Sequence, residues 1–308
     1  MNSGAVQLPT RDGVGPSCIA LPVGPWLRVI DFLAQRFPNV SRDEIAARMA
    51  RGDVIDELGD YVLPERVYTA HLKLFYYRSI EIEERIPFDE AVLFQDDYLL
   101  AVDKPHFLPV TPGGRYLQET LLVRLKRKLG IDTLAPMHRL DRETAGVMLF
   151  SIQPAQRCKY HALFECRAVM KRYQAIAPYR ADLTFPLTRR SRLVEGDSFM
   201  RMREADGDGD AGEPNTETRI ELLETMGELA RYRLTPLSGK KHQLRVHMAA
   251  LGMPIVNDKI YPVHHSIAQI EDGDYSKPLQ LLAEYIAFTD PVTGEAREFT
   301  SRLQLTGA

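Results

Sequence analysis

The stretch that decides the fold is Met137-His-Arg-Leu-Asp-Arg-Glu-Thr-Ala-Gly-Val-Met-Leu-Phe150. It places an imidazole, two guanidinium groups and a carboxylate directly before an apolar run of strand character, Val147 to Ile152. Because adjacent cations favour the charged form of a carboxyl group, we expect Asp141 to be ionised. An aspartate in this setting is a nucleophile, a general base or one half of a structural ion pair, and the ion pair is the commonest of the three.

The composition of the 308-residue chain is that of a globular protein with room for one large domain and one small domain. No apolar run approaches the roughly 20 residues of a membrane span, and the first 20 residues lack the pattern of a signal peptide. The three cysteines include no CxxC pair, which argues against a disulfide framework and a cysteine-built zinc site. These features predict a cytoplasmic protein without membrane partners.

The net charge of −3 gives no global indication of nucleic-acid binding, so the distribution of charge matters more than its sum. Basic side chains cluster at 124–128, 171–172, 189–192 and 240–241. Taken alone, such clusters on a surface of mixed charge are usually solvated faces.

The N-terminal region predicts a flexible lead-in over residues 1–20, followed by a small domain. Apolar residues recur at helical spacing over 26–37, and Ser41 and Glu44 have the spacing of a capping box that starts a second helix. Short strands are predicted after it, at 54–55, 61–63 and 72–77.

Two short helices followed by a small hairpin resemble an S4-type RNA-binding module over residues 21–85. The signature of that module is R-x-x-I-x-x-x-x-x-x-G-x-V, and the matching residues are Arg42, Ile45, Gly52 and Val54. The basic residues that usually surround the second helix are reduced here to Arg48 and Arg51. An S4-like fold that binds RNA poorly is therefore an open alternative.

A larger domain is predicted over residues 88–308, after a charged, turn-prone linker around Pro87. It opens with a predicted hairpin of strands at 91–95 and 99–104. Predicted helices follow at 117–129, 154–169 and 242–251, with strands at 147–152, 171–177, 219–224, 230–236 and 279–289.

Metal sites are not supported by the spacing of the candidate ligands. The string Asp206-Gly-Asp-Gly-Asp210, with Glu217 at the twelfth position, faintly resembles a calcium loop, but Ala211 replaces the required glycine. We therefore predict a solvated loop. His242 and His247 are five residues apart, which turns them away from a common metal on one face of a helix.

Three separated segments carry the remaining chemical groups: His138–Arg142, Lys171–Tyr173 and Ser238–His247. In the third segment, Gly239 permits the close approach of an anion to the start of a helix. Neither a G-x-x-x-x-G-K-[ST] phosphate loop nor a G-x-S-x-G serine hydrolase motif is present. An aspartate, arginines, a tyrosine and basic loops suit a carboxylate-dependent reaction on a planar substrate that carries phosphates.

The same segments resemble the ordered motifs of the RluA-type RNA pseudouridine synthases. The motifs are HRLDRETAG at 138–146, KRYQA at 171–175 and GKKHQLRVH at 239–247, followed by LGMPI at 251–255. Asp103-Lys-Pro105 before them and Pro291-Val-Thr-Gly294 after them also match, so the resemblance covers about residues 91–295. It implies an α+β domain built on a mixed, largely antiparallel sheet with flanking helices.

The resemblance also implies an isomerase that converts uridines of structured ribosomal or transfer RNA to pseudouridine after base flipping. The family's catalytic aspartate is here Asp141, and Tyr173 is in the position that packs on the uracil and suits proton transfer at C5. Arg245 is in the position that pairs with the catalytic carboxylate. Arg139 matches the residue that fills the base stack when the uridine is flipped out. No metal and no cofactor is implied.

Further RNA contacts are predicted from the basic side chains of these motifs: Arg142, Lys171, Lys240, Lys241 and His242. Departures from the family pattern lie at Ala145, Ser238, Lys240 and Asn257, and they affect RNA contacts rather than the proposed catalytic group. The alternative from another class is a non-catalytic RNA-binding protein that kept the fold. Nothing in the sequence requires more than a monomer.

Overall fold

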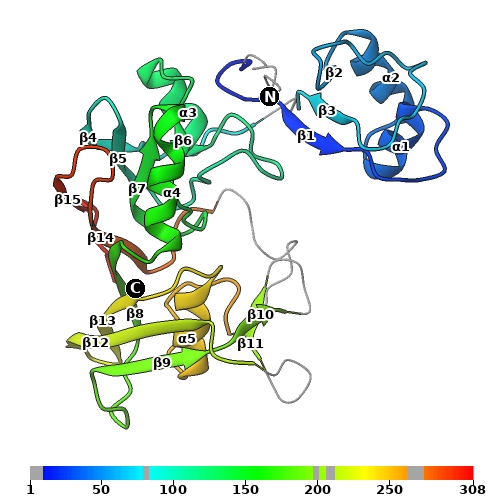
Figure 1. Cartoon of the computed structure of the whole chain (residues 1–308). Helices are drawn as coiled ribbons and strands as arrows, with labels where there is room; N and C mark the ends of the chain where they lie inside the picture. Colours follow the sequence, from blue (N-terminus) through cyan, green and yellow to red (C-terminus); the bar gives the residue numbers. More distant parts are fainter. Residues whose placement is uncertain (1–9, 79–82, 197–200, 206–211, 263–273, 308) are drawn as a thin grey trace. The chain divides into compact units, whose positions relative to one another are not determined.

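The computed structural model describes residues 10–78, 83–196, 201–205, 212–262 and 274–307 (Figure 1). The chain divides into two compact units. The smaller unit comprises residues 1–83 with 112–118, and the larger unit comprises residues 84–111 with 119–308. Residues 112–118, which the sequence placed in the larger domain, therefore group with the smaller unit.

The smaller unit contains two helices, α1 (Val29–Arg36) and α2 (Arg42–Ala50), and a three-stranded antiparallel sheet. The strand order is β1 (Ser17–Ala20), β3 (Lys73–Tyr76), β2 (Val54–Asp56). Its core is formed by side chains from all these elements, including Val29, Phe32, Leu33, Ile45, Met49, Val54 and Leu74. The sequence patterns therefore located both helices, β2 and the last strand.

Only half of the predicted capping box is present at the start of α2. The Ser41 hydroxyl accepts a hydrogen bond from the Glu44 backbone N–H at 3.2 Å. The Glu44 carboxylate instead pairs with Arg48, one helical turn further on, at 2.7 Å.

Two predictions for the smaller unit were wrong. Residues 17–20 belong to β1 and pair with β3, so they are not part of a flexible lead-in. No strand forms over 61–63, where Tyr61 makes a single bridge to Ile55. The Asp56 carboxylate accepts the backbone N–H groups of Leu58 and Asp60, which curls the chain into a loop instead of an extended hairpin.

The larger unit is built on a ten-stranded sheet, as the sequence resemblance implied. Its main path is β4 (Ala91–Gln95), β5 (Leu99–Lys104), β7 (Ala145–Ser151), β14 (Leu281–Thr289), β8 (Met170–Pro178), β13 (Leu229–Pro236), β12 (Thr216–Met226) and β9 (Leu187–Ser191). β6 (Ala135–Pro136) pairs with β7, and β15 (Ala296–Thr300) pairs with β14. Every pairing is antiparallel except that of β7 with β14, so the sheet is mixed and largely antiparallel.

Helices pack on both halves of this sheet. α4 (Arg157–Glu165), which follows the 3-10 turn η1 (Pro154–Gln156), buries Tyr160 among the side chains of the β5–β7 half. α5 (Gln243–Ala250) buries Leu244 and Met248 among the side chains of β8, β12 and β13. Figure 1 shows α4 beside β7 and α5 beside β12 and β13.

The predicted helices differ from the structure at their ends. The helix expected over 117–129 is α3 (Leu121–Leu129), because the Thr120 side chain caps its first turn and Gly130 closes it in the left-handed conformation. The helix expected over 154–169 ends at Glu165, because Arg167 has a positive φ of 57° and turns the chain into β8.

Several strands were not anticipated from the sequence, among them β9, β15 and the hairpin of β10 (Leu193–Glu195) and β11 (Met202–Glu204). The acidic string at 206–210 lies outside the described residues. Within the described ranges, no group of three or more His, Cys, Asp or Glu side chains could hold a metal ion. Nor does any helix there have the length and apolar character to cross a membrane.

Gly146 joins the two halves of the sheet. It lies opposite Ala283 where β7 runs parallel to β14, and its φ is +114°. A Cβ atom at this position would lie 2.2 Å from the Ala283 carbonyl oxygen. Only glycine combines this backbone conformation with so close an approach of two strands.

Replacing Gly146 by alanine is therefore expected to lower the free energy of unfolding by more than about 4 kcal/mol, the range of severe core mutations. Urea denaturation followed by circular dichroism measures the loss. The matched control is Gly130→Ala, where φ is +67° but no atom lies within 4 Å of the added Cβ. The control should cost only about 1–2 kcal/mol for the left-handed backbone. Equal losses for the two variants would show that the strand approach is not tight.

Candidate active site

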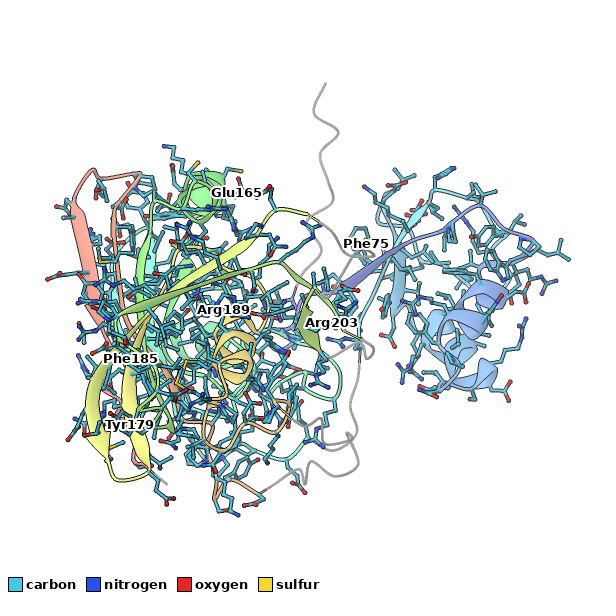
Figure 2. All side chains as sticks on the ribbon, turned by 90° about the horizontal axis from the view of Figure 1, so that it is seen from below. Phe75, Glu165, Tyr179, Phe185, Arg189 and Arg203 are labelled. Carbon is cyan, nitrogen blue, oxygen red and sulfur yellow. The ribbon has the colours of Figure 1, made fainter. Side chains whose placement is uncertain are left out.

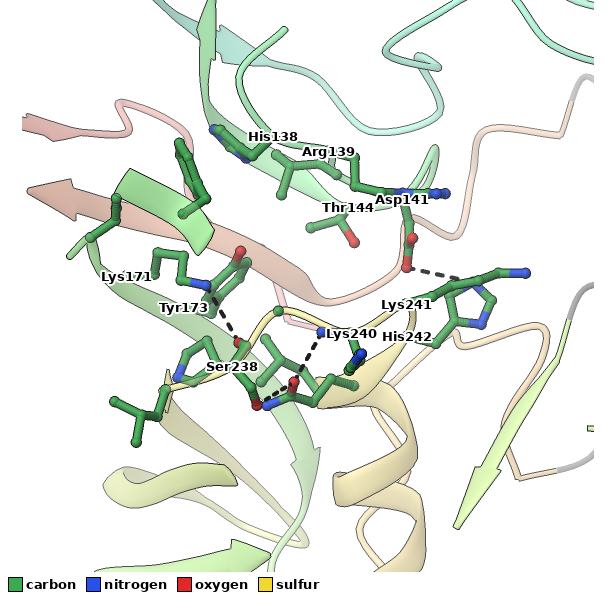
Figure 3. Close-up of a pocket in the computed structure, with 18 of the residues that line it drawn as sticks. His138, Arg139, Asp141, Thr144, Lys171, Tyr173, Ser238, Lys240, Lys241 and His242 are labelled. Atoms are coloured by element: carbon green, nitrogen blue, oxygen red, sulfur yellow. Dashed lines mark hydrogen bonds and ion pairs between the residues drawn. The ribbon is translucent and has the colours of Figure 1, made fainter. Parts of the chain in front are cut away.

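A cavity of about 450 Å³ in the larger unit brings the three motif segments together (Figure 3). Its walls come from the loop before β7, the first half of β8 and the β13–α5 loop. The predicted site residues that line it are Arg139, Asp141, Lys171, Tyr173, Lys240, Lys241, His242 and Arg245. Segments that are a hundred residues apart in the sequence thus share one site.

Asp141 presents its carboxylate to this cavity from a tight turn before β7. The Thr144 backbone N–H closes the turn by donating to the Asp141 carbonyl oxygen at 3.1 Å. The Asp141 side chain is 19 % exposed, and its Oδ2 accepts a hydrogen bond from Arg245 Nη1 at 3.2 Å. His242 Nε2 lies 3.8 Å from the same oxygen.

Arg245 is fixed by a second carboxylate, that of Asp258, which was not predicted as a site residue. Its Nε and Nη2 donate to the two Asp258 oxygens, each at 2.7 Å. The backbone N–H groups of Ile260 and Tyr261 also donate to Asp258. Since both side chains of this pair are almost fully buried, the fork geometry holds the guanidinium in one orientation. In the sequence, Asp258 is only an isolated aspartate after the motif that contains Arg245. Its position in the sequence does not by itself indicate that the two side chains pair.

The charge state of Asp141 follows from its neighbours. Burial alone would raise its pKa, but His242 and Arg245 together lower the pKa of Asp141 below its usual value. Burial lowers the pKa of His242 to about 4, so this imidazole is uncharged at neutral pH. Arg245 is therefore the cation that keeps Asp141 ionised at neutral pH.

Tyr173 lies on β8 with its ring at the cavity, and Figure 3 shows it beside Lys171. Burial, and then the charge of Asp141, raises the pKa of the Tyr173 phenol well above its ordinary value. The hydroxyl group thus stays protonated at neutral pH. A protonated aromatic side chain of this kind can pack on a neutral planar base.

The other polar residues of the third motif hold the loop in place. The Gln243 side chain accepts from the Lys240 N–H at 3.2 Å and donates to the Glu217 carbonyl oxygen at 3.0 Å. His247 is fully buried, and its ring nitrogens contact the hydroxyl groups of Thr216 and Thr218 at 3.0 Å. Both residues join α5 to β12, and of the two only Gln243 also lines the cavity.

Arg142 is the predicted RNA contact that the structure does not bring to the cavity. Its guanidinium pairs with Glu143 at 2.6 Å. Its carbonyl oxygen accepts a hydrogen bond from Lys104 Nζ at 3.0 Å. Lys104 is fully buried and also donates to the carbonyl oxygens of Pro105 and Leu108. The lysine of the Asp103-Lys-Pro105 motif therefore anchors the residue that follows Asp141.

Comparison with known proteins identifies the family. The profile of the RNA pseudouridylate synthase family matches residues 98–250. The dual-specificity RNA pseudouridine synthase RluA of Haemophilus influenzae is 32% identical over 213 residues, which is 68% of this chain and 92% of that protein. An uncharacterized RNA pseudouridine synthase of Synechocystis is 28% identical over 254 residues, 80% of this chain and 86% of that protein.

Solved structures show the same fold. The solved structure of the protein named Human RNA Pseudouridylate Synthase Domain Containing 4 aligns with 70% of this chain and with 88% of its own chain. The TM-score is 0.54 and the sequence identity is 26%. The solved structure of Human RNA Pseudouridylate Synthase Domain Containing 1 aligns with 72% of this chain and with 86% of its own chain. Its TM-score is 0.57 at 22% sequence identity. The chain belongs to the RNA pseudouridylate synthase family. Within that family it is an isomerase of the RluA type.

The buried Arg245–Asp258 pair is expected to control the stability of the site. Replacing Asp258 by asparagine leaves a buried guanidinium without its full counter-charge, which typically costs about 3–5 kcal/mol of unfolding free energy. Urea denaturation measures this loss. The matched control is Asp182→Asn, which breaks the solvent-exposed pair with Arg180 and should leave the midpoint unchanged. An unchanged midpoint for Asp258→Asn would show that the pair is not needed for folding.

Proposed function

We propose that this protein converts specific uridines in structured ribosomal or transfer RNA to pseudouridine, with Asp141 as the catalytic residue. The observation that carries the proposal is the Asp141 carboxylate, held ionised by Arg245 at one side of a cavity that Tyr173 also lines. An intact pair of this kind argues against a non-catalytic protein that only retains the fold.

In the proposed reaction, Asp141 attacks the flipped-out uridine, on the base or on the sugar. The bond between uracil N1 and ribose C1′ breaks, the base turns, and a new bond joins C5 to C1′. The bond between Asp141 and the nucleoside breaks in the same sequence, which returns the carboxylate. The proton on C5 is then lost and N1 gains one, so the product has the composition of the substrate. Tyr173 packs on the uracil, a role that its protonated hydroxyl group supports. No step needs an oxidant or a metal ion.

The cations around the cavity suit the RNA backbone. Arg139 and Lys240 are exposed, and Arg139 lies two residues before Asp141. We assign Arg139 to the gap that the flipped uridine leaves in the base stack. Lys171, Lys240, Lys241 and His242 line the cavity where phosphates and ribose would enter.

We also propose that the protein acts as a monomer in the cytoplasm, in line with its few, unpaired cysteines.

Replacing Asp141 by asparagine is expected to abolish pseudouridine formation while RNA affinity stays within a few-fold, because the two side chains are nearly isosteric. Release of tritium from RNA that carries C5-labelled uridine measures turnover, and filter binding measures affinity. Pseudouridine mapping of cellular RNA with and without the protein identifies the target. Persistent turnover in this variant would assign the catalytic group elsewhere, and Asp182→Asn serves as the control.

We propose that the smaller unit is an S4-like module that adds RNA affinity. The order of α1, α2 and the following strands supports this assignment. However, the two arginines at the end of α2 form ion pairs with neighbouring carboxylates. Arg48 pairs with Glu44, and Arg51, the residue after the helix, lies 3.4 Å from Asp53. Their attraction for phosphate is thereby reduced, so the contribution of the module should be small.

The double substitution Arg48→Gln and Arg51→Gln should weaken RNA affinity without changing the rate of the chemical step. Two lost phosphate contacts would lower the slope of log affinity against log salt by at most about 2. Binding titrations at several salt concentrations and single-turnover kinetics measure the two effects. Arg85→Gln, which breaks a solvent-exposed pair with Asp89, is the control. Unchanged affinity would make the module a structural appendage.

A further inference from the structure

The cavity continues beyond the residues proposed to hold the target uridine. Besides the group around Asp141, it is lined by residues at the end of α4, the start of β8 and the end of β13. We call this region the outer end and define it by Phe164, Glu165, Arg167, Val169 and Leu237. No role in the proposed reaction has been assigned to these five residues.

The outer end adjoins the uridine site at Lys171 and Ser238. The Lys171 ammonium group donates to the Ser238 carbonyl oxygen at 3.4 Å, which ties the start of β8 to the end of β13. Leu237 directly precedes Ser238, and Val169 lies two residues before Lys171. Figure 3 shows this contact beside Tyr173, with Asp141 and His242 further along the cavity. The outer end is therefore continuous with the part of the cavity that Tyr173 lines.

An aromatic surface is available at the outer end. The Phe164 ring stacks on His138, with ring centroids 5.0 Å apart and an angle of 26° between the planes. Burial lowers the pKa of His138 to about 3, so this imidazole is uncharged and stacks as a neutral ring. Phe164 is only half-buried, and the Leu237 side chain is 52% exposed. Half-exposed apolar side chains of this kind provide a platform for an unstacked base.

Two charged side chains of opposite sign accompany this platform. Glu165, labelled in Figure 2, is the last residue of α4, and Arg167 follows it by two positions. Both are exposed, and neither side chain has a hydrogen bond or ion pair with any residue in the described ranges. A carboxylate repels phosphate, so on an RNA-facing surface its favourable contacts are with the N–H groups of a base.

We propose that the outer end binds a guanine next to the target uridine, an inference that rests on the proposed function. The guanine stacks on Phe164, and the Glu165 carboxylate accepts from its adjacent N1–H and N2–H groups. Arg167 donates to O6 or N7 of the same base. Uracil offers one N–H between two carbonyl groups, whereas cytosine and adenine place a ring acceptor beside the amino group. Guanine alone presents two adjacent donors to a carboxylate.

The experiment uses a library of RNA stem–loops in which one loop uridine is fixed and its neighbours on both sides are randomised. The full-length protein is incubated with the library, and the modified molecules are sequenced. In parallel, Asp141→Asn protein is used to select bound molecules. We expect guanine to be enriched at one neighbouring position in both arms, by about 10- to 100-fold, the discrimination of one bidentate base contact.

Glu165→Gln should abolish the enrichment, because the amide offers only one acceptor, and the matched control Glu228→Gln on the exposed β12–β13 turn should retain it. Phe164→Ala should weaken binding of all library members together. Modification without a guanine preference, or a preference that survives Glu165→Gln, overturns the inference and leaves the proposed function intact. Absence of modification throughout overturns the proposed function, and the binding arm then decides the guanine site by itself.

Discussion

The Arg245 guanidinium lies between two carboxylates, and the site depends on that arrangement. Asp258 holds it from one side through two hydrogen bonds of 2.7 Å, and Asp141 accepts its remaining contact on the cavity side. Asp258 is fully buried and also accepts hydrogen bonds from two backbone N–H groups, so its carboxylate is held in one place. The position of the Arg245 guanidinium is therefore fixed as well. The carboxylate of Asp141 is thus oriented and ionised before any substrate binds.

That arrangement works only because two halves of the sheet meet at the correct distance. Asp141 is carried by the chain that enters β7, whereas Arg245 is carried by α5, which packs on β12 and β13. The joint between the halves is the short parallel pairing of β7 with β14, where Gly146 lets two backbones approach. The close approach of β7 and β14 at Gly146 therefore determines how Asp141 and Arg245 face each other.

The sequence predicted the residues that line the cavity better than the residues that hold them in place. Asp141, Tyr173 and Arg245 lie in motifs whose order is specific, so their meeting in one cavity was expected. Asp258 was overlooked because a single acid in a loop gives no periodic or compositional signal of a partner. Arg142 was assigned to RNA for its charge alone, although the neighbouring Glu143 neutralises it. Likewise, β1 is only four residues long, and its pairing with β3 depends on a contact far along the chain.

The parallel pairing of β7 with β14 also has a consequence for how the chain reaches its native state. Ala145 of β7 pairs with Leu282 of β14, so this edge of β7 has no partner until β14 has been synthesised. Such a long-range contact forms late, after a large loss of chain entropy. During synthesis, the edge of β7, which follows the Asp141 turn, therefore lacks this partner until β14 has left the ribosome. The cavity that Asp141 lines is therefore complete only after β14, which contributes Leu281 to it, has been made.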